Sequence, residues 1–312
     1  MSKEFHHISV LLEECIEGLA IKPDGIYVDG TLGGAGHSSR IAAELTTGRL
    51  IGIDRDPVAL AAAGKRLEPW LDRVSFVHSN FCEIANALDE LGIDKVDGIL
   101  LDLGVSSPQL DDGERGFSYM VDAPLDMRMN SADTRDAHYI VNNYSYEELK
   151  RILYDFGEER YAPKIAAAIC NRREEKTIET TLELVDIIRS AMPAAALREK
   201  QHPAKRSFQA IRIAVNDELD SVSKVMEAAI PRLNKGGRLA VITFHSLEDR
   251  IVKNAMANAA KGCTCPPNFP VCVCGKKPQV KLITRKPIVS GDEELERNPR
   301  ARSAKLRICE KL

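Results

Sequence analysis

The stretch that decides the fold runs from residue 26 to residue 37 and reads Ile26-Tyr27-Val28-Asp29-Gly30-Thr31-Leu32-Gly33-Gly34-Ala35-Gly36-His37. It begins as a short apolar strand, turns at a glycine-rich loop and leads into a helical pattern. Because glycine tolerates a positive φ and carries no side chain, such a loop lets the backbone approach a ligand closely. Taken alone, the segment is also compatible with a tight turn that binds nothing.

The next strand pattern, 50–53, ends at Asp54, where a carboxylate can accept hydrogen bonds from both hydroxyls of a ribose. NAD-binding folds share this feature, but they usually carry the spacing G-x-G-x-x-G, and the glycines here stand at 30, 33, 34 and 36. Asp29 heads the loop, where its charge would repel a diphosphate and suit a cation. The pattern therefore favours S-adenosylmethionine over a dinucleotide.

Strand and helix patterns alternate on both sides of this loop. Continuous apolar strands separated by helices imply a parallel sheet that is covered on both faces. We expect strands at 26–28, 50–53, 74–77, 96–101, 238–244 and 305–309, and helices at 37–45, 58–67 and 83–91. The sequence thus predicts an α/β fold with a Rossmann-like sheet.

Between about 109 and 216 the strand patterns disappear and helical patterns take their place. Ser145 with Glu148, and Thr180 with Glu183, have the spacing of capping boxes at helix starts. We expect a sheet domain made of 1–108 and 217–312, and an inserted helical domain at 109–216 that recognises the substrate.

Composition excludes several classes of protein. The chain has 312 residues, 44% of them hydrophobic, and a net charge of −3, which argues against coating nucleic acid by charge alone. No run approaches the roughly 20 apolar residues that span a bilayer. The first residues show no targeting pattern, so we expect a cytoplasmic protein with no membrane contact. A monomer and a homodimer are both compatible with the sequence.

Further polar and aromatic positions follow the strand patterns. Phe81 comes after the third strand, where it could enclose an adenine or simply pack in the core, and Asp102 ends the fourth strand. In open α/β sheets, ligands bind outside the carboxyl ends of the strands. Four positions are therefore expected to meet in one crevice: Asp29, Asp54, Phe81 and Asp102.

Four of the eight cysteines crowd into one short segment, and without a secretion signal a disulfide framework is not expected. They are Cys263, Cys265, Cys272 and Cys274. Four thiolates suit zinc, although C-x-C is tighter than the common C-x2-C spacing, and a metal-free cysteine-rich loop is the alternative.

Basic residues form three local groups that could track phosphates or remain solvated faces. The groups are Lys200, His202, Lys205, Arg206 and Arg212; Lys276, Lys277, Lys281, Arg285 and Lys286; and Arg297, Arg300, Arg302, Lys305 and Arg307. We expect the second and third groups to form an RNA-facing rim.

Several unusual blocks occur in one order along nearly the whole chain. They include Tyr27-Val28-Asp29-Gly30-Thr31-Leu32-Gly33-Gly34-Ala35-Gly36-His37-Ser38, Asp54-Arg55-Asp56-Pro57, Leu101-Asp102-Leu103-Gly104-Val105-Ser106-Ser107-Pro108-Gln109-Leu110-Asp111, Pro124-Leu125-Asp126-Met127-Arg128-Met129, Phe244-His245-Ser246-Leu247-Glu248-Asp249-Arg250 and Asn298-Pro299-Arg300-Ala301-Arg302-Ser303. With these blocks the chain resembles the bacterial ribosomal RNA small-subunit methyltransferase H family.

The resemblance implies a class I methyltransferase sheet with S-adenosylmethionine as methyl donor. It implies methylation of the exocyclic N4 of a cytosine in the decoding region of 16S ribosomal RNA, with that RNA in the small subunit as partner. By the resemblance, seven residues contact the cofactor: Ala35, Gly36, His37, Asp54, Phe81, Asp102 and Gln109. His37 and Gln109 enter through the resemblance alone. The cysteine pairs are not shared by all members, so the common chemistry does not require them.

Methylating an exocyclic amine needs a hydrogen-bond or proton acceptor, because the nitrogen lone pair is delocalised into the ring. Asp102 is the candidate catalytic residue, although the segment after it lacks the Pro-Pro-aromatic sequence of many amino methyltransferases. The base-stacking side chain is therefore expected from Phe117, Tyr119 or elsewhere in the insertion. No Pro-Cys motif lies beside the sheet to supply the thiolate that C5 methylation needs.

His245 and Ser246 end the fifth strand, where they could reach a substrate, and Ser246 could equally cap the following helix. Two other functions stay open at this stage. One is a non-catalytic RNA-binding ribosome assembly factor on a vestigial fold. The other is an NAD-dependent oxidoreductase, which the loop spacing and Asp29 disfavour.

Overall fold

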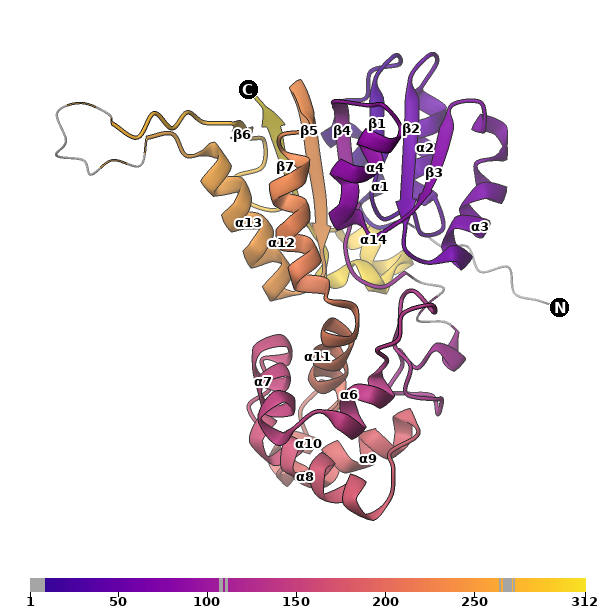
Figure 1. Ribbon diagram of the computed structural model, residues 1–312, viewed down its shortest axis with the longest axis vertical. Helices are drawn as coiled ribbons and strands as arrows, with labels where there is room; N and C mark the ends of the chain where they lie inside the picture. Colours follow the sequence, from indigo (N-terminus) through magenta and orange to yellow (C-terminus); the bar gives the residue numbers. More distant parts are fainter. Residues whose placement is uncertain (1–8, 107–108, 110–111, 264, 266–270, 272) are drawn as a thin grey trace. The chain divides into compact units, whose positions relative to one another are not determined.

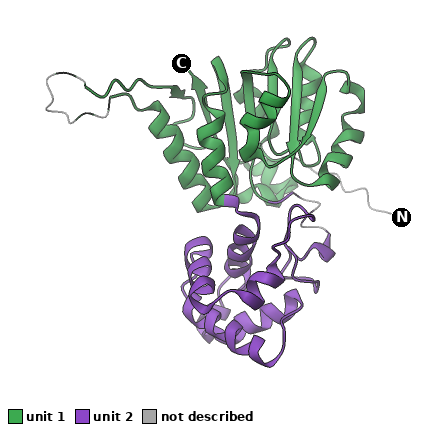
Figure 2. Cartoon of the chain, viewed as in Figure 1, with its two compact units in different colours: residues 1–104, 219–312 green, residues 105–218 purple. Residues whose placement is uncertain are grey.

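The computed structural model describes residues 9–106, 109, 112–263, 265, 271 and 273–312. The chain forms two compact units, one made of residues 1–104 with 219–312 and the other of residues 105–218 (Figure 2). The first unit is therefore discontinuous in sequence. Within the described residues, none of the helices combines the length and apolar character that crossing a bilayer requires.

The first unit is built on a seven-stranded sheet with the order β3-β2-β1-β4-β5-β7-β6 (Figure 1). Strands β1 to β5 are parallel, and β7 runs antiparallel to both of its neighbours. The strands are β1 (Ile26–Asp29), β2 (Arg49–Asp54), β3 (Val74–His78), β4 (Val96–Asp102), β5 (Leu233–Thr243), β6 (Val280–Leu282) and β7 (Lys305–Lys311). This sheet confirms the predicted α/β, Rossmann-like class I methyltransferase fold.

Helices cover both faces of the sheet, as the continuous apolar strands predict. Tyr27 of β1 packs on one face with side chains of α1, α2 and α3, and the next residue, Val28, packs on the other face with α4, α12 and α13. The helices of this unit are α1 (Leu12–Leu19), α2 (Gly36–Glu44), α3 (Pro57–Arg66), α4 (Ile84–Glu90), α12 (Glu218–Ala229), α13 (Ser246–Ala260) and α14 (Asp292–Arg297).

Two strand predictions differ from the structure. Strand β5 begins at Leu233, five residues before the predicted start, because Leu233 already pairs with Val96 of β4. The ladder is irregular after this pair, where Gly236 has a φ of 79°. Strand β6 was not predicted. Only Val280 of its three residues is buried, so it carries too little apolar pattern to be distinguished from a loop.

The second unit is helical, apart from one isolated bridge between Pro124 and Thr180 among its described residues. Both predicted capping boxes are confirmed, with Ser145 and Glu148 at the start of α7 and Thr180 and Glu183 at the start of α9. The helices are α6 (Ala137–Asn143), α7 (Tyr146–Gly157), α8 (Ala162–Glu175), α9 (Thr181–Ala191), α10 (Ala194–Leu197) and α11 (Lys205–Asn216). Apolar side chains from α6, α7, α8, α9 and α11 form one core.

Asn216, the last residue of α11, fastens an irregular segment of this unit. Its side chain is buried, and its Oδ1 accepts a hydrogen bond from the Met129 N–H at 2.8 Å. Its Nδ2 donates to the carbonyl oxygens of Met127 at 2.8 Å and of Arg212 at 2.9 Å. Met127 has a φ of 60°, so the side chain holds a segment in a conformation that methionine rarely adopts.

We expect Asn216→Ala to lower the free energy of unfolding by about 2–4 kcal/mol, because it leaves buried backbone groups without partners. Urea denaturation measures this difference. Asn143→Ala is the control, since Asn143 is exposed and makes one bond to a helical carbonyl oxygen. Equal effects of the two substitutions would contradict the role assigned to Asn216.

Candidate functional site

The carboxylate of Asp29, at the end of β1, is turned into the protein. Its exposed fraction is 2%; Oδ1 accepts from the Thr31 N–H at 3.1 Å, and Oδ2 accepts from the Ser38 hydroxyl at 2.7 Å. Burial raises the pKa of this carboxyl group, and the hydrogen bonds from Ser38 and Thr31 oppose the shift. The expectation that Asp29 faces the ligand is therefore wrong. Its carboxylate holds the loop to α2 from inside.

The glycines of the loop have different reasons to be glycine. Gly33 has a φ of 48° and donates its N–H to Oδ2 of Asp54 at 2.7 Å. A Cβ on Gly36 would lie 1.8 Å from Oγ of Ser9, so helix α2 begins in close contact with that residue. Around Gly34 a Cβ would meet no described atom within 4 Å. The loop is thus packed at its two ends and open in its middle.

Asp54 lies at the end of β2, as predicted, and closes the loop from the neighbouring strand. Its Oδ2 accepts from Gly33, and its Oδ1 accepts from the Asp56 N–H at 2.9 Å. Burial raises the pKa of Asp54 to about 6, helped by the charges of Asp56 and Asp29 and opposed by the two N–H donors. The carboxyl group is partly exposed, so it can still accept bonds from a ligand.

Phe81 lies directly after β3, in the short helix η2 (Phe81–Glu83), and is half-buried. A Cβ on Gly30 would lie 3.3 Å from Cβ of Phe81 and 2.5 Å from Cδ2 of Leu101. The loop after β1 therefore passes against the chain that follows β3. Glycine is needed at position 30 because a side chain would collide with this packing.

His37, in the first turn of α2, is buried, and its Nε2 lies 2.9 Å from the carbonyl oxygen of Val10. A carbonyl oxygen only accepts, so Nε2 carries the proton. Burial lowers the pKa of His37 to about 4, and the ring is neutral at physiological pH. Its Nδ1 then has a free lone pair, 3.8 Å from Oδ2 of Asp102.

Asp102, at the end of β4, has a strongly perturbed carboxyl group. Burial raises its pKa to about 8, and the nearby charges of Asp29 and Glu248 add to the shift. Its Oδ1 is buried and has no hydrogen-bond partner among the residues that the structure describes. Buried polar atoms without partners are rare, so this oxygen is a candidate contact for a ligand.

Two residues that were not predicted as site residues act on Asp102, Thr31 through a hydrogen bond and Glu248 through its charge. The Thr31 hydroxyl accepts a hydrogen bond from the Asp102 N–H at 2.6 Å, which ties the loop to the end of β4. Glu248 is 1% exposed and accepts from the Phe244 N–H at 2.9 Å, at the end of β5. Glu248 could have been predicted from its position, because it is an acidic residue in the first helical turn after the end of β5.

The helix after β5, α13, has a different N-cap residue from the one predicted. Helix α13 begins at Ser246, and His245 is its N-cap, with Nδ1 accepting from the Glu248 N–H at 3.5 Å. The prediction that Ser246 caps this helix is therefore wrong by one residue. His245 and Glu248 form a reciprocal capping box, so both side chains serve the helix start.

The second unit holds the remaining predicted residues. Gln109 is buried, and its Oε1 accepts from the Ser106 N–H at 3.0 Å; its cofactor role stays a prediction. Phe117 lies in the helical core, 6% exposed, so it is closed to a base. Tyr119 is half-buried and stacks on His202, with ring centroids 4.6 Å apart.

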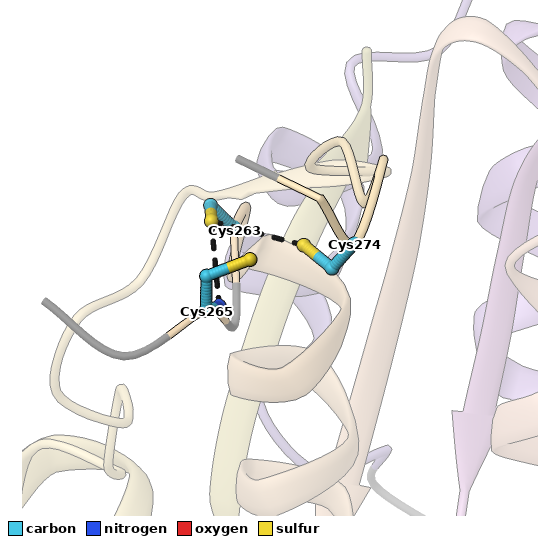
Figure 3. A group of neighbouring side chains, drawn as sticks. All are labelled: Cys263, Cys265 and Cys274. Atoms are coloured by element: carbon cyan, nitrogen blue, oxygen red, sulfur yellow. Dashed lines mark hydrogen bonds between the residues drawn. The ribbon is translucent and has the colours of Figure 1, made fainter. Parts of the chain in front are cut away.

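Three predicted zinc ligands are described, and they lie together. The Sγ atoms of Cys263, Cys265 and Cys274 are all within 4.8 Å of one another (Figure 3). Cys272, the fourth predicted ligand, lies outside the described residues. The cluster belongs to the segment between α13 and β6, apart in sequence from the loop and strand ends that form the cofactor site.

Comparison with known proteins covers almost the entire chain. The model described as the MraW methylase family matches residues 4–312. A protein from Heliobacterium mobile is 57% identical over 311 residues, covering 99% of this chain and 100% of its own. One from Clostridium botulinum is 59% identical over 310 residues, covering 99% and 100%. One from Brevibacillus brevis is 57% identical over 309 residues, covering 99% and 98%. All three are named ribosomal RNA small subunit methyltransferase H.

The raised pKa of Asp102, about 8, predicts a pH-dependent stability. Between about pH 4 and pH 8 the unfolded chain releases this proton while the folded chain keeps it, so stability falls as the pH rises. Asp102→Asn removes that loss. We expect the variant's gain in unfolding free energy, measured by urea denaturation, to be about 3–4 kcal/mol larger at pH 8 than at pH 5.

Asp72→Asn is the matched control for this measurement. The Asp72 side chain is exposed, and its hydrogen bond with Arg73 lowers its pKa, so no gain that grows with pH is expected. A gain for Asp102→Asn that is the same at both pH values would contradict the shifted pKa.

Proposed function

The chain belongs to the MraW methylase family, and from this premise we propose that it transfers a methyl group from S-adenosylmethionine to ribosomal RNA of the small subunit. We further propose that the acceptor is the exocyclic N4 of a cytosine in the decoding region of 16S ribosomal RNA. The relatives' names support the first proposal. The proposed acceptor, the N4 of a cytosine, follows from the resemblance in sequence.

The residues at the strand ends fit the proposed cofactor. Asp54 would accept hydrogen bonds from the ribose hydroxyls, because its partly exposed carboxyl group stands at the end of β2. Phe81, half-buried beside the loop, would pack against the adenine. The space around Gly34 leaves room for the ligand along the loop.

Helix α2 begins at Gly36 with no side-chain cap, so the N–H groups of its first turn suit a carboxylate such as that of the methionine moiety. This explains how Ala35, Gly36 and His37 could contact the cofactor although the His37 ring is committed to Val10. The contacts would come from the backbone. Gln109 is the seventh proposed contact.

Asp102 carries the proposed chemistry. A carboxyl group with a pKa of about 8 is well matched to accepting a proton near neutral pH, and its Oδ1 lacks a hydrogen-bond partner among the described residues. S-adenosylmethionine supplies an electrophilic methyl group when bound. The Asp102 carboxylate would accept a hydrogen bond from the N4 amine, which localises the nitrogen lone pair. It would then take the proton that the nitrogen loses on gaining the methyl group.

His37 would assist by placing an uncharged ring beside the Asp102 carboxyl group, without a hydrogen bond, because the two facing atoms are both acceptors when Asp102 is ionised. Its neutral ring presents Nδ1, 3.8 Å from Oδ2 of Asp102, and the ring itself is fixed through Nε2 by Val10. A neutral partner neither stabilises the Asp102 carboxylate as strongly as a cation would nor repels a cationic ligand. The pKa of Asp102 therefore stays high enough for proton transfer.

We assign the second unit, 105–218, to recognition of the RNA substrate. Tyr119 is the candidate base-stacking residue, because it is half-buried with its ring already oriented by His202 and Phe208. Stacking on an aromatic ring suits a base that is taken out of its helix. Arg212 of the first basic group donates two hydrogen bonds to the Glu218 carboxylate, at 2.8 and 2.9 Å. This pair stabilises the second unit, so we do not assign Arg212 to RNA binding.

The proposed RNA-facing rim is narrower than the two basic groups predicted. Arg307 and Lys305 pair with Asp249, and Lys281 pairs with Glu310 at 2.7 Å. The exposed members that remain are Lys276, Lys277, Arg285 and Lys286 of the second group and Arg297, Arg300 and Arg302 of the third. We propose this smaller set as the phosphate contact, with the small ribosomal subunit in the cytoplasm as partner.

Zinc is the second cofactor that we propose, at Cys263, Cys265 and Cys274. Methyl transfer would not depend on it, because these cysteines are not common to the whole family that the chain resembles.

Incubation with labelled S-adenosylmethionine and unmethylated small subunits should label one cytosine of 16S RNA, located by digestion and mass spectrometry. Asp102→Asn should lower the rate constant of transfer at least about 100-fold, because the variant cannot take up the proton. RNA affinity should stay within a few fold of wild type. No labelled RNA with the wild-type protein would favour a non-catalytic assembly factor.

Charge reversal of the rim, Lys276→Glu with Lys277→Glu, should weaken binding to the small subunit at least about tenfold at 0.1 M salt. Titration calorimetry should show unchanged affinity for S-adenosylmethionine. The control is Lys95→Glu with Lys235→Glu. Both lysines are exposed and lie near the N-terminal ends of β4 and β5, whereas the proposed cofactor site lies at the C-terminal ends of the strands. Equal losses of RNA affinity in both pairs would mean a general charge effect, which excludes a specific rim.

A further inference from the structure

The short segment of residues 9–11 packs against the first turn of α2, where the methionine carboxylate of the proposed cofactor would bind. The Val10 carbonyl oxygen accepts the hydrogen bond from Nε2 of His37 at 2.9 Å. A Cβ on Gly36 would lie 1.8 Å from Oγ of Ser9, so the two stretches of chain touch there without room for a side chain. All three residues of the segment are buried. The position of this segment therefore sets both the His37 ring and the backbone at the start of α2.

Leu11 ends this segment in an unfavourable backbone conformation. Its φ is 51° and its ψ is 40°, in the left-handed region that leucine rarely adopts. It is the N-cap residue of α1, and its side chain makes no capping hydrogen bond. Because a strained residue keeps such a conformation only where its surroundings fix it, another group has to hold Leu11 in place.

Glu294, on α14 near the other end of the chain, supplies this contact. Its Oε1 accepts a hydrogen bond from the Leu11 N–H at 2.8 Å. A charged acceptor makes such a bond stronger than one between neutral groups. Leu11 is fully buried, so without Glu294 its N–H would lose its partner where water does not reach it. The bond is therefore the link that fixes residues 9–11.

Apolar packing carries Glu294 to this position. The next residue, Leu295, packs against the core cluster that contains Ala35 of the glycine-rich loop. Ala301, in the short helix η4 (Pro299–Ser303), is fully buried in the same cluster. This short helix comes from one of the unusual blocks of the sequence and takes no part in the chemistry proposed above. Its packing places α14 beside the loop.

The charge of Glu294 also reaches the His37 ring. Burial lowers the pKa of His37 to about 4; the hydrogen bond with Val10 and the charge of Glu294 oppose this shift, and the charge of Arg66 adds to it. The ring nevertheless stays neutral at physiological pH. Glu294 therefore acts on His37 through residues 9–11 and not by pairing with a cationic ring.

We propose that Glu294 is a positioning residue of the cofactor site. Through Leu11 it fixes residues 9–11, and these hold the His37 ring and the first turn of α2 in place. The backbone N–H groups of that turn are then set to bind the methionine carboxylate. This inference rests on the proposed function, because the carboxylate belongs to S-adenosylmethionine. Glu294 acts through Leu11 and is assigned no contact with the cofactor itself.

The test compares Glu294→Ala, Glu294→Asp and Glu294→Gln in the full chain. Gln keeps an oxygen acceptor at the same reach, whereas Ala has none and Asp is one methylene too short. By titration calorimetry, Ala and Asp should each weaken S-adenosylmethionine binding at least about tenfold, and Gln should stay within about threefold of wild type. In methyl transfer, KM for S-adenosylmethionine should rise while kcat changes little, because the substitutions leave Asp102 in place.

Nitrogen NMR of the His37 ring gives a readout that a loss of stability alone would not change. In the wild-type chain the ring should be neutral, with its proton on Nε2. Glu294→Ala and Glu294→Asp should let the proton exchange between the two ring nitrogens, and Glu294→Gln should keep the wild-type signal. Thermal unfolding shows whether each variant is folded, and the Asp and Gln variants decide the matter if Ala is not.

Glu296→Ala is the matched control, since Glu296 is exposed and lies on the same helix, α14. It should leave the affinity for S-adenosylmethionine and the His37 signal unchanged. A Glu294→Ala variant that behaves like Glu296→Ala would overturn the proposal. So would a loss in Glu294→Gln as large as in Glu294→Ala, because the charge and not the hydrogen bond would then be responsible.

Failure of this proposal is distinct from failure of the proposed function. The His37 signal is read without RNA or S-adenosylmethionine, and cofactor affinity is read without RNA. A wild-type chain that binds S-adenosylmethionine and methylates no RNA would refute the transfer and leave the role of Glu294 intact. A chain that methylates small subunits equally well with and without the Glu294 side chain would do the reverse.

Discussion

The site depends on the hydrogen bonds that the buried carboxylate of Asp29 accepts. This carboxylate binds Thr31 within the loop and Ser38 in α2, and so joins the end of β1 to both. Thr31 then accepts from the backbone of Asp102 at the end of β4. Through these few hydrogen bonds, one residue sets the shape of the loop and the place of the reactive carboxyl group on the neighbouring strand.

The arrangement concentrates acidic groups where parallel strands end. The charge of Asp29 raises the pKa values of both Asp54 and Asp102, so its carboxyl group lies close enough to each of them to disfavour their charged forms. This repulsion is unfavourable for folding, but it leaves a site that gains from a cationic ligand. The same tension that weakens the folded state at higher pH thus favours a sulfonium cofactor and prepares Asp102 to accept a proton.

Much of the fold was predictable because its signals are local. The strand ends at Asp54 and Asp102 and the capping boxes at Ser145 and Thr180 follow from short-range patterns, and the structure contains them. The inward turn of Asp29 was not predictable, because it depends on Ser38, nine residues away on a helix. The role of Glu248 likewise depends on the strand order, which a linear pattern does not contain.

The discontinuity of the sheet unit has a consequence for how the protein folds. Strands β3, β2, β1 and β4 are neighbours in the sheet and all precede the insertion, whereas β5, β7 and β6 all follow it. During synthesis from the N-terminus, the first four strands can pair before the helical unit emerges. Until β5 arrives, β4 is an unpaired edge with open backbone groups, and such edges invite pairing with other chains. The helical unit has to fold within this interval, and its core is complete only when α11 packs against α7.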